Sequence, residues 1–98
     1  MSVYFVVNDS VKDMALLGEY YAGAGPTMAT STGKALVVEH AAETIEGNPR
    51  GSRVIVIEFP DREAAMAWYN SPEYQAVIGK RHAATEDGFM LLVNGLPG

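Results

Sequence analysis

The stretch that decides the fold is Arg53-Val54-Ile55-Val56-Ile57-Glu58-Phe59, followed by Pro60-Asp61 and an alanine-rich run over residues 62–69. Four β-branched residues in succession are typical of a strand, and an aspartate ahead of such a run is a good helix N-cap. Ser71-Pro72-Glu73 then supplies a second start signal, with a cap residue, a proline at the first helical position and an acid in the first turn. The stretch therefore predicts a strand followed by a helix with two starts.

Three other apolar runs of strand length lie around this stretch: Val3 to Val7, Ala35 to Val38 and Phe89 to Val93. The intervals Ser10 to Thr32 and Asp61 to Asp87 are predicted to be helical. The predicted order is thus strand, helix, strand, strand, helix, strand. This order predicts a ferredoxin-like βαββαβ sandwich over residues 1–98, an α+β domain in which helices cover one face of a four-stranded antiparallel sheet.

The first helical interval carries its own expectations. Asp9 or Ser10 is the expected N-cap. The expected core stripe is Val11, Met14, Leu17, Gly18 and Tyr21, with Leu16 and Tyr20 on the opposite side. Gly23-Ala24-Gly25-Pro26 is expected to bend or end the helix, because proline removes a backbone donor.

The predicted strands are apolar on both faces, whereas an antiparallel sheet with one wet face usually alternates. Something must cover the second face, and a two-fold partner that presents the same face is the simplest cover. We therefore expect a homodimer through the open sheet face. A larger heteromeric complex is the alternative.

Charge and composition exclude several classes of function. The chain of 98 residues has a net charge of −5 and no cysteine, which argues against nucleic-acid and membrane partners and excludes thiol chemistry. The first residues lack the features of a signal peptide and no apolar run is long enough for a membrane span, so we expect a cytoplasmic protein. Sheets of this order also bind RNA, but strand 53–59 carries aliphatic residues where stacking aromatics would be needed.

Two charged residues within apolar patterns are the first site candidates. Glu58 ends an apolar strand and is a candidate general base, or else a strand-end carboxylate paired with an arginine. Arg81 is the expected partner, because it shares a helical stripe with Tyr74 and Ile78. Its guanidinium could hold the carboxylate or enolate of a ligand, or could simply extend to solvent at the end of the helix.

His40 closes the second strand and is a candidate for moving protons near neutral pH, against the simpler interpretation of a structural histidine. His82 is expected on the surface. A metal site would require both histidines and a carboxylate to converge, which no ligand spacing supports, and no cofactor is expected. Tyr20, Trp68 and Tyr74 are candidate walls of a ligand pocket, although Trp68 and Tyr74 are most simply core residues.

A long motif in the second half of the chain resembles the domain-of-unknown-function family 1330. The motif comprises Glu58-Phe59-Pro60, residues 63–69 and Ser71-Pro72-Glu73-Tyr74-Gln75, with Gly25-Pro26-Thr27 and Ile45-Glu46-Gly47 as further points of similarity. The resemblance implies the dimeric α+β barrel superfamily, whose members include cofactor-independent monooxygenases, lactone isomerases and haem-dependent enzymes. Many family members carry Arg-Gly-Gly where this chain has Val38-Glu39-His40, so its ligand is expected to differ.

Two hypotheses of function remain open from the sequence. In the first, the protein binds a small anionic or aromatic metabolite between sheet and helices and acts as a cofactor-independent enzyme, with Arg81 holding an oxygen and Glu58 or His40 moving a proton. In the second, it is a non-catalytic binding or assembly module, in which Glu58 and Arg81 form a structural ion pair.

Overall fold

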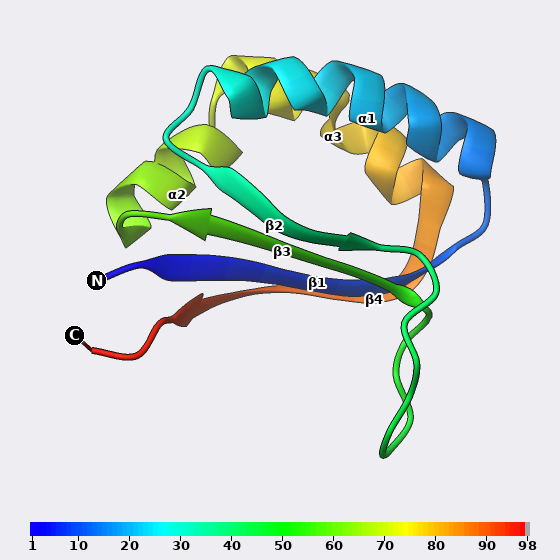
Figure 1. The fold of residues 1–98 in the computed structure, drawn as a ribbon. Coiled ribbons are helices and arrows are strands. Elements are labelled where there is room, and N and C mark those ends of the chain that lie inside the picture. The colour runs from blue at the N-terminus through cyan, green and yellow to red at the C-terminus, as the bar shows by residue number, and fades with distance from the viewer. Residues whose placement is uncertain (98) are drawn as a thin grey trace.

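The computed structural model describes residues 1–97. Its elements are β1 (Val3–Val11), α1 (Met14–Ala29), β2 (Lys34–Glu39), β3 (Arg53–Phe59), α2 (Arg62–Tyr69), α3 (Pro72–Ala84) and β4 (Thr85–Asn94). The strands form one antiparallel sheet in the order β2-β3-β1-β4, and the three helices lie over the same face of it (Figure 1). The predicted ferredoxin-like fold is confirmed.

The central strands β1 and β3 put alternate residues on the two faces of the sheet. Val3, Phe5 and Val7 of β1 are buried beneath the helices, as are the odd-numbered residues of β3 from Arg53 to Phe59. β1 continues four residues beyond the predicted run, to Val11. The apolar pattern stops at Val7 because the next two residues, Asn8 and Asp9, are buried polar groups that bond to the neighbouring strand and loop.

Helix α1 differs from its prediction at both ends. Asp13, rather than Asp9 or Ser10, is the N-cap, and its Oδ1 accepts a hydrogen bond from the amide of Leu16. The helix also continues through Pro26 to Ala29. Gly23 within it meets α3, because a Cβ atom there would lie 2.6 Å from Cγ1 of Val77. This glycine therefore serves close helix packing rather than helix termination.

The buried stripe of α1 is also rotated from the predicted one. Leu17, Tyr20 and Ala24 are buried, whereas Met14 is 58% exposed. The predicted stripe began at Val11, which belongs to β1 and so says nothing about the face that the helix presents. Tyr20, expected off the core stripe, is consequently buried, and its hydroxyl group contacts that of Tyr74 on α3.

Helices α2 and α3 begin where the sequence predicts. Asp61 Oδ1 accepts from the amide of Ala64, and Ser71 Oγ accepts from the amide of Tyr74. The predicted face of α3 is confirmed: its buried side chains are Tyr74, Ile78, Arg81 and Ala84. Within residues 1–97, the structure contains no helix of the length and apolar character needed to cross a bilayer.

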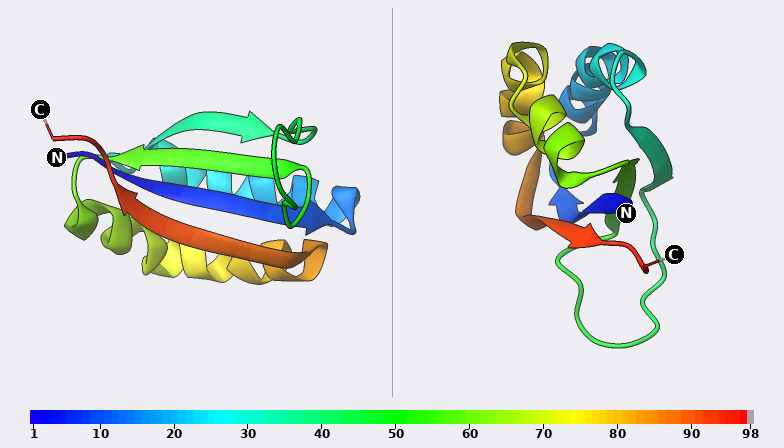
Figure 2. Two further views of the ribbon diagram at one scale, coloured as in Figure 1. Left: turned by 90° about the horizontal axis from the view of Figure 1, so that it is seen from below. Right: turned by 90° about the vertical axis from the view of Figure 1, so that its left-hand side faces the viewer.

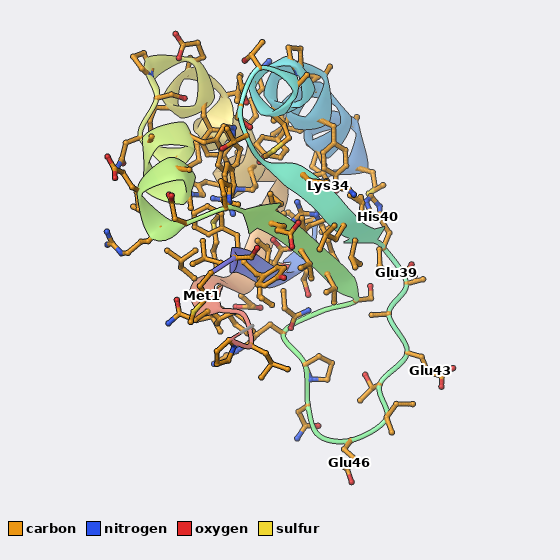
Figure 3. All side chains as sticks on the ribbon, turned by 60° about the vertical axis from the view of Figure 1, so that its left-hand side comes forward. Met1, Lys34, Glu39, His40, Glu43 and Glu46 are labelled. Carbon is orange, nitrogen blue, oxygen red and sulfur yellow. The ribbon has the colours of Figure 1, made fainter. Side chains whose placement is uncertain are left out.

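The sheet face away from the helices is not covered by any helix of residues 1–97, as Figure 2 shows from below. Several of its exposed side chains are apolar. Phe89, Leu91 and Val93 of β4 and Val37 of β2 are each at least 40% exposed there. The prediction that the strands are apolar on both faces is confirmed. Residues 40–52 form a long loop that projects from this side of the sheet and carries Glu43 and Glu46 at its outer part (Figures 1 and 3).

Candidate functional site

A cavity of about 480 Å³ lies between α1 and the strands β2 and β3. Small residues of α1 and of the edge strand β2 leave room between the helix and the strand. These are Ala24, Gly25, Ala29 and Ala35. The apolar lining is completed by Met28, Val38, Ile55, Ile57 and Trp68. An apolar cavity with a few polar groups is the usual form of a small-molecule site.

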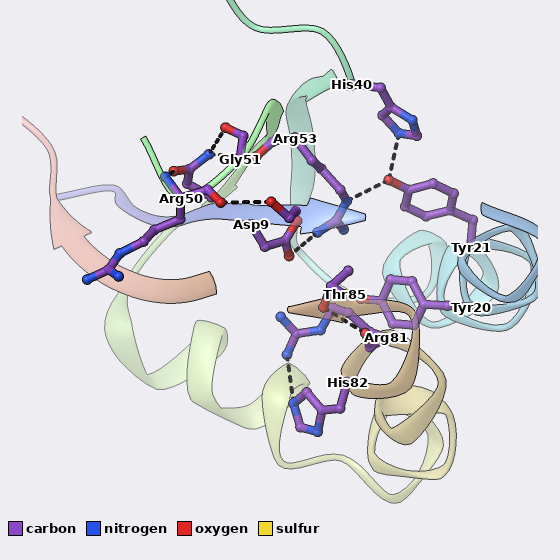
Figure 4. A network of polar contacts seen from close by, with 12 residues as sticks. Asp9, Tyr20, Tyr21, His40, Arg50, Gly51, Arg53, Arg81, His82 and Thr85 are labelled. Atoms are coloured by element: carbon purple, nitrogen blue, oxygen red, sulfur yellow. Dashed lines mark hydrogen bonds and ion pairs between the residues drawn. The ribbon is translucent and has the colours of Figure 1, made fainter. Parts of the chain in front are cut away.

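The polar groups of this cavity belong to Arg53, Tyr21 and Tyr20. Arg53 begins β3 and is only 2% exposed. Its Nη1 donates to Oδ2 of Asp9 over 2.6 Å, and its Nε donates to the hydroxyl oxygen of Tyr21 over 3.0 Å (Figure 4). Burial acts to lower the pKa of Arg53, but the bonds to Tyr21 and Asp9 outweigh it, so the pKa is raised. The guanidinium is therefore a fixed cation in the cavity wall.

The side chain of Asn8 holds the start of β3 in place. The amide group of Asn8 donates to the carbonyl oxygens of Gly51 and Arg53, and its oxygen accepts from the backbone amide of Arg50. These bonds tie the end of the projecting loop to β1. Arg53, which follows this loop, is thereby held opposite Asp9, its partner in the strand register.

Tyr21 connects this arginine to His40. The Tyr21 hydroxyl lies 2.9 Å from Nε2 of His40, and the two rings are 5.8 Å apart between centroids. His40 follows directly after β2, at the point where the loop begins (Figure 3). Because the Tyr21 oxygen already accepts from Arg53, its proton is free to be donated to Nε2 of His40 in the tautomer that is protonated on Nδ1. Asp9, Arg53, Tyr21 and His40 thus form one continuous chain of hydrogen bonds.

Tyr20 and Trp68, two of the three residues that the sequence suggested as pocket walls, line the same cavity. The hydroxyl groups of Tyr20 and Tyr74 are 2.7 Å apart, and burial, followed by the neighbouring Tyr74, raises the pKa of Tyr20 well above its ordinary value. Tyr20 is therefore a neutral hydrogen-bonding group. Tyr74 is 1% exposed and stacks against Trp68 behind the wall rather than lining it.

Glu58 does not lie with the other predicted residues. It alternates with the buried Ile57 and Phe59, so its side chain is on the open face of the sheet, where Oε2 accepts from the Tyr4 hydroxyl over 2.9 Å. Arg81 is on α3, on the other side of the sheet. The predicted Glu58–Arg81 ion pair is therefore wrong, and Glu58 faces away from the cavity. The face that it shares with Val54 and Val56 is the outer one.

Arg81 is buried, with 7% exposure, but lines a different cavity of about 300 Å³ between α3 and β4. Asp9, Tyr69, His82, Thr85 and Glu86 line it as well. His82 is exposed, as predicted, and its Nε2 lies 3.5 Å from Nη2 of Arg81. The single pocket that the sequence predicted is thus divided, with Asp9 and its bond to Arg53 between the two halves.

Sequence reasoning missed Asp9, Tyr21 and Arg53. A signal was available, because antiparallel pairing of the two central apolar runs, with Val3 opposite Phe59, places Asp9 opposite Arg53. Opposite charges at paired positions of buried strands indicate an ion pair. Among residues 1–97, no three histidine, cysteine or acidic side chains come close enough together to hold a metal ion.

Comparison with solved structures supports the fold. The chain is similar to a protein of unknown function from Rhodopseudomonas palustris, with a TM-score of 0.80, 18% identity and coverage of 99% of this chain and 84% of the other. A variant of SnoaB, a cofactor-independent oxygenase from Streptomyces nogalater, has a TM-score of 0.71 at 16% identity, with 99% and 95% of the chains covered. A dimeric protein of unknown function and ferredoxin-like fold from Bacteroides fragilis has a TM-score of 0.65 at 10% identity, with 96% of each chain covered.

Among curated proteins, none matches the sequence. The family model described as a domain of unknown function, DUF1330, matches residues 2–96, which is nearly the whole chain. The ferredoxin-like fold, the motif around α2 and the extent of this match agree, and the chain belongs to the DUF1330 family.

Proposed function

We propose that the cavity between α1, β2 and β3 binds a small aromatic metabolite with a weakly acidic hydroxyl group and removes the proton of that group. The observation that carries the proposal is the chain from Arg53 through Tyr21 to His40 in the wall of an otherwise apolar cavity. An aromatic ring fits the apolar lining, and its hydroxyl group is placed at the polar wall. The similarity to a cofactor-independent oxygenase supports a reaction that needs no resident cofactor.

The proton moves in one concerted step. The ligand hydroxyl donates its proton to the Tyr21 oxygen while the Tyr21 proton passes to Nε2 of His40, across the 2.9 Å contact. The products are the ligand anion and a protonated His40, so Tyr21 is unchanged. Arg53 stabilises the new anion, because a buried guanidinium acts strongly in a site with little water.

Other residues orient the ligand. Tyr20 stays neutral because its pKa is raised by burial and by Tyr74, so it offers a hydrogen bond without competing for the proton. The Trp68 ring is held by the bond from its Nε1 to Oγ1 of Thr27, over 3.1 Å, and gives the ligand a flat surface. His40 is the base in this scheme, and Glu58 takes no part.

The test uses 2-naphthol, whose neutral and anionic forms differ in absorbance. We expect bound 2-naphthol to ionise at a pH about 1–3 units lower than in free solution, the usual effect of a nearby cation. In His40→Gln, 2-naphthol should still bind, but its ionisation pH should fall by less than in the wild type, because the proton acceptor is lost while Arg53 remains. Tyr21→Phe should give the same loss, and His82→Gln, which changes the exposed histidine, should behave like the wild type.

Binding without any change in the ionisation of 2-naphthol would contradict the proton-transfer role and leave a binding protein. Identical ionisation in the wild type and in His40→Gln would remove His40 from the scheme. Failure of 2-naphthol and of larger hydroxylated naphthalenes to bind would count against the cavity itself as an aromatic site.

We further propose that two copies associate through the open face of the sheet. Exposed apolar residues lie on the outer face of both edge strands, namely Phe89, Leu91 and Val93 of β4 and Val37 of β2, and proteins of similar fold are described as dimeric. Leu91→Asp places a charge in that surface and should convert the dimer to a monomer in sedimentation velocity. Gln75→Asp, on the exposed side of α3, is the control and should leave the mass unchanged. A wild-type monomer at high concentration would overturn this proposal.

A further inference from the structure

We propose a second binding site, independent of the function proposed above: the cavity between α3 and β4 binds a small 2-hydroxycarboxylate through Arg81 and Asp9. Both side chains line this cavity of about 300 Å³. Both are more than nine-tenths buried, and each has a polar atom without a hydrogen-bond partner, Nε of Arg81 and Oδ1 of Asp9. Two unpartnered groups of opposite chemistry at one cavity indicate a ligand that satisfies both.

The balance of charge indicates an anion. Two buried guanidinium groups, those of Arg53 and Arg81, lie near one buried carboxylate, and Asp9 is bonded to Arg53. Within the described part of the chain, no carboxylate lies within ion-pair distance of Arg81, whose one side-chain hydrogen bond is the 3.5 Å contact with His82. A buried cation without a counter-ion is costly, even though the chain as a whole carries a net charge of −5. A ligand carboxylate supplies the missing charge and can accept two parallel hydrogen bonds from the guanidinium.

The free oxygen of Asp9 specifies the second group of the ligand. Oδ2 accepts from Arg53, whereas Oδ1 accepts from nothing and therefore requires a donor. A hydroxyl group next to the ligand carboxylate provides that donor and leaves Asp9, Arg53, Arg81 and the ligand with no net charge. An α-amino acid would leave the same set with an excess positive charge, which disfavours it in a buried site.

The remaining lining fits an apolar substituent. Tyr69 and Met90 face the cavity beside the charged pair, and a volume of about 300 Å³ accommodates a single ring. The hydroxyl of Thr85 is occupied, because it donates to the carbonyl oxygen of Arg81. Glu86 is an exposed acid on the lining and is a carboxylate that can compete with a ligand for Arg81. Mandelate combines the required carboxylate, hydroxyl group and ring.

Isothermal titration with four matched compounds tests the assignment on the wild-type protein. Mandelate should bind most tightly. Phenylacetate, which lacks the hydroxyl group, should bind about 10-fold or more weakly, the typical loss of a hydrogen bond to a charged group. Mandelamide, which lacks the charge, and phenylglycine, which carries an ammonium group, should show no binding at concentrations up to about 10 mM. Equal binding of mandelate and phenylacetate would remove Asp9 from the site, and no binding of mandelate would overturn it.

Variants then locate the site. Arg81→Gln should abolish mandelate binding, and Lys80→Gln, which removes the same charge from the exposed neighbouring position, should not. Glu86→Gln should tighten binding by removing the competitor. Amide NMR signals of Thr85 to Met90 should shift with mandelate, whereas those of α1 should not. If Arg81→Gln does not fold, Arg81→Lys keeps the charge, loses the paired donors and should bind at least 10-fold more weakly. Shifts confined to α1, or full binding by the folded Arg81→Gln variant, would disprove the proposal without affecting the cavity over β2 and β3.

Discussion

Arg53 and Asp9 form a buried ion pair between register partners of β3 and β1, with Nη1 of the arginine 2.6 Å from Oδ2 of the aspartate. The pair lies between two cavities, one lined by Arg53 and the other by Asp9. It fixes the guanidinium so that Nε reaches Tyr21. The ion pair within the sheet thereby orients the Arg53 side chain in the wall of the proposed site.

Asp9→Asn should therefore lower the free energy of unfolding by about 3–5 kcal/mol, because it keeps the shape of the side chain but leaves a buried guanidinium without its counter-ion. Urea denaturation measures this loss. The exposed pair of Lys80 and Glu19, 3.7 Å apart on neighbouring helices, is the control. Lys80→Ala should change the free energy of unfolding by no more than about 0.5 kcal/mol.

Replacing both charges separates the cost of an unpaired charge from the value of the pair. The double variant Asp9→Asn with Arg53→Met should recover much of the stability lost by Asp9→Asn alone, since no unpaired charge remains in the interior. If the double variant lost more free energy of unfolding than the two single variants together, the ion pair would have a different role in stability.

The strands were predictable because their apolar residues cluster in short runs. The starts of α2 and α3 were predictable because Asp61 and Ser71 are good N-cap residues. The path of α1 was not. Pro26 and Gly23 were interpreted by their local preferences, whereas the helix is held by its packing on α3 and the sheet. Tertiary contacts can override the local cost of such residues.

The site was only partly predictable for a related reason. Tyr20 and Trp68 line the cavity, but Glu58 was assigned to the interior because it shares a face with valines. In a sheet that is apolar on both faces, the pattern of apolar residues in the sequence does not tell which face meets the helices. Asp9 and Arg53 become partners only once the register of β1 and β3 is known.

Tyr20 should make the stability of the fold depend on pH in the alkaline range. Its pKa is raised in the folded state above the ordinary value of 10.0, chiefly by burial. The unfolded chain therefore releases this proton first, and the free energy of unfolding should fall as pH rises above about 10. The slope between about pH 10 and 11 should be smaller in Tyr20→Phe, which cannot ionise.

Tyr20→Phe also removes the bond to Tyr74, so it should lower stability at neutral pH by about 1 kcal/mol. Urea unfolding at a series of pH values measures both effects. The same alkaline slope in Tyr20→Phe and the wild type would assign the pH dependence to another group.

Two glycines of α1 should respond to alanine in opposite directions. At Gly18 no atom lies within 4 Å of an added Cβ, so Gly18→Ala should stabilise the protein by roughly 0.5–1 kcal/mol through helix propensity alone. At Gly23 the added atom would lie 2.6 Å from Cγ1 of Val77, so Gly23→Ala must push α1 from α3 and should cost about 1–3 kcal/mol. Combining Gly23→Ala with Val77→Ala frees that space and should restore part of the loss. If Gly23→Ala stabilised the fold as much as Gly18→Ala, the glycine would not be required for the contact between α1 and α3, and the continuation of α1 past Gly23 would need a different cause.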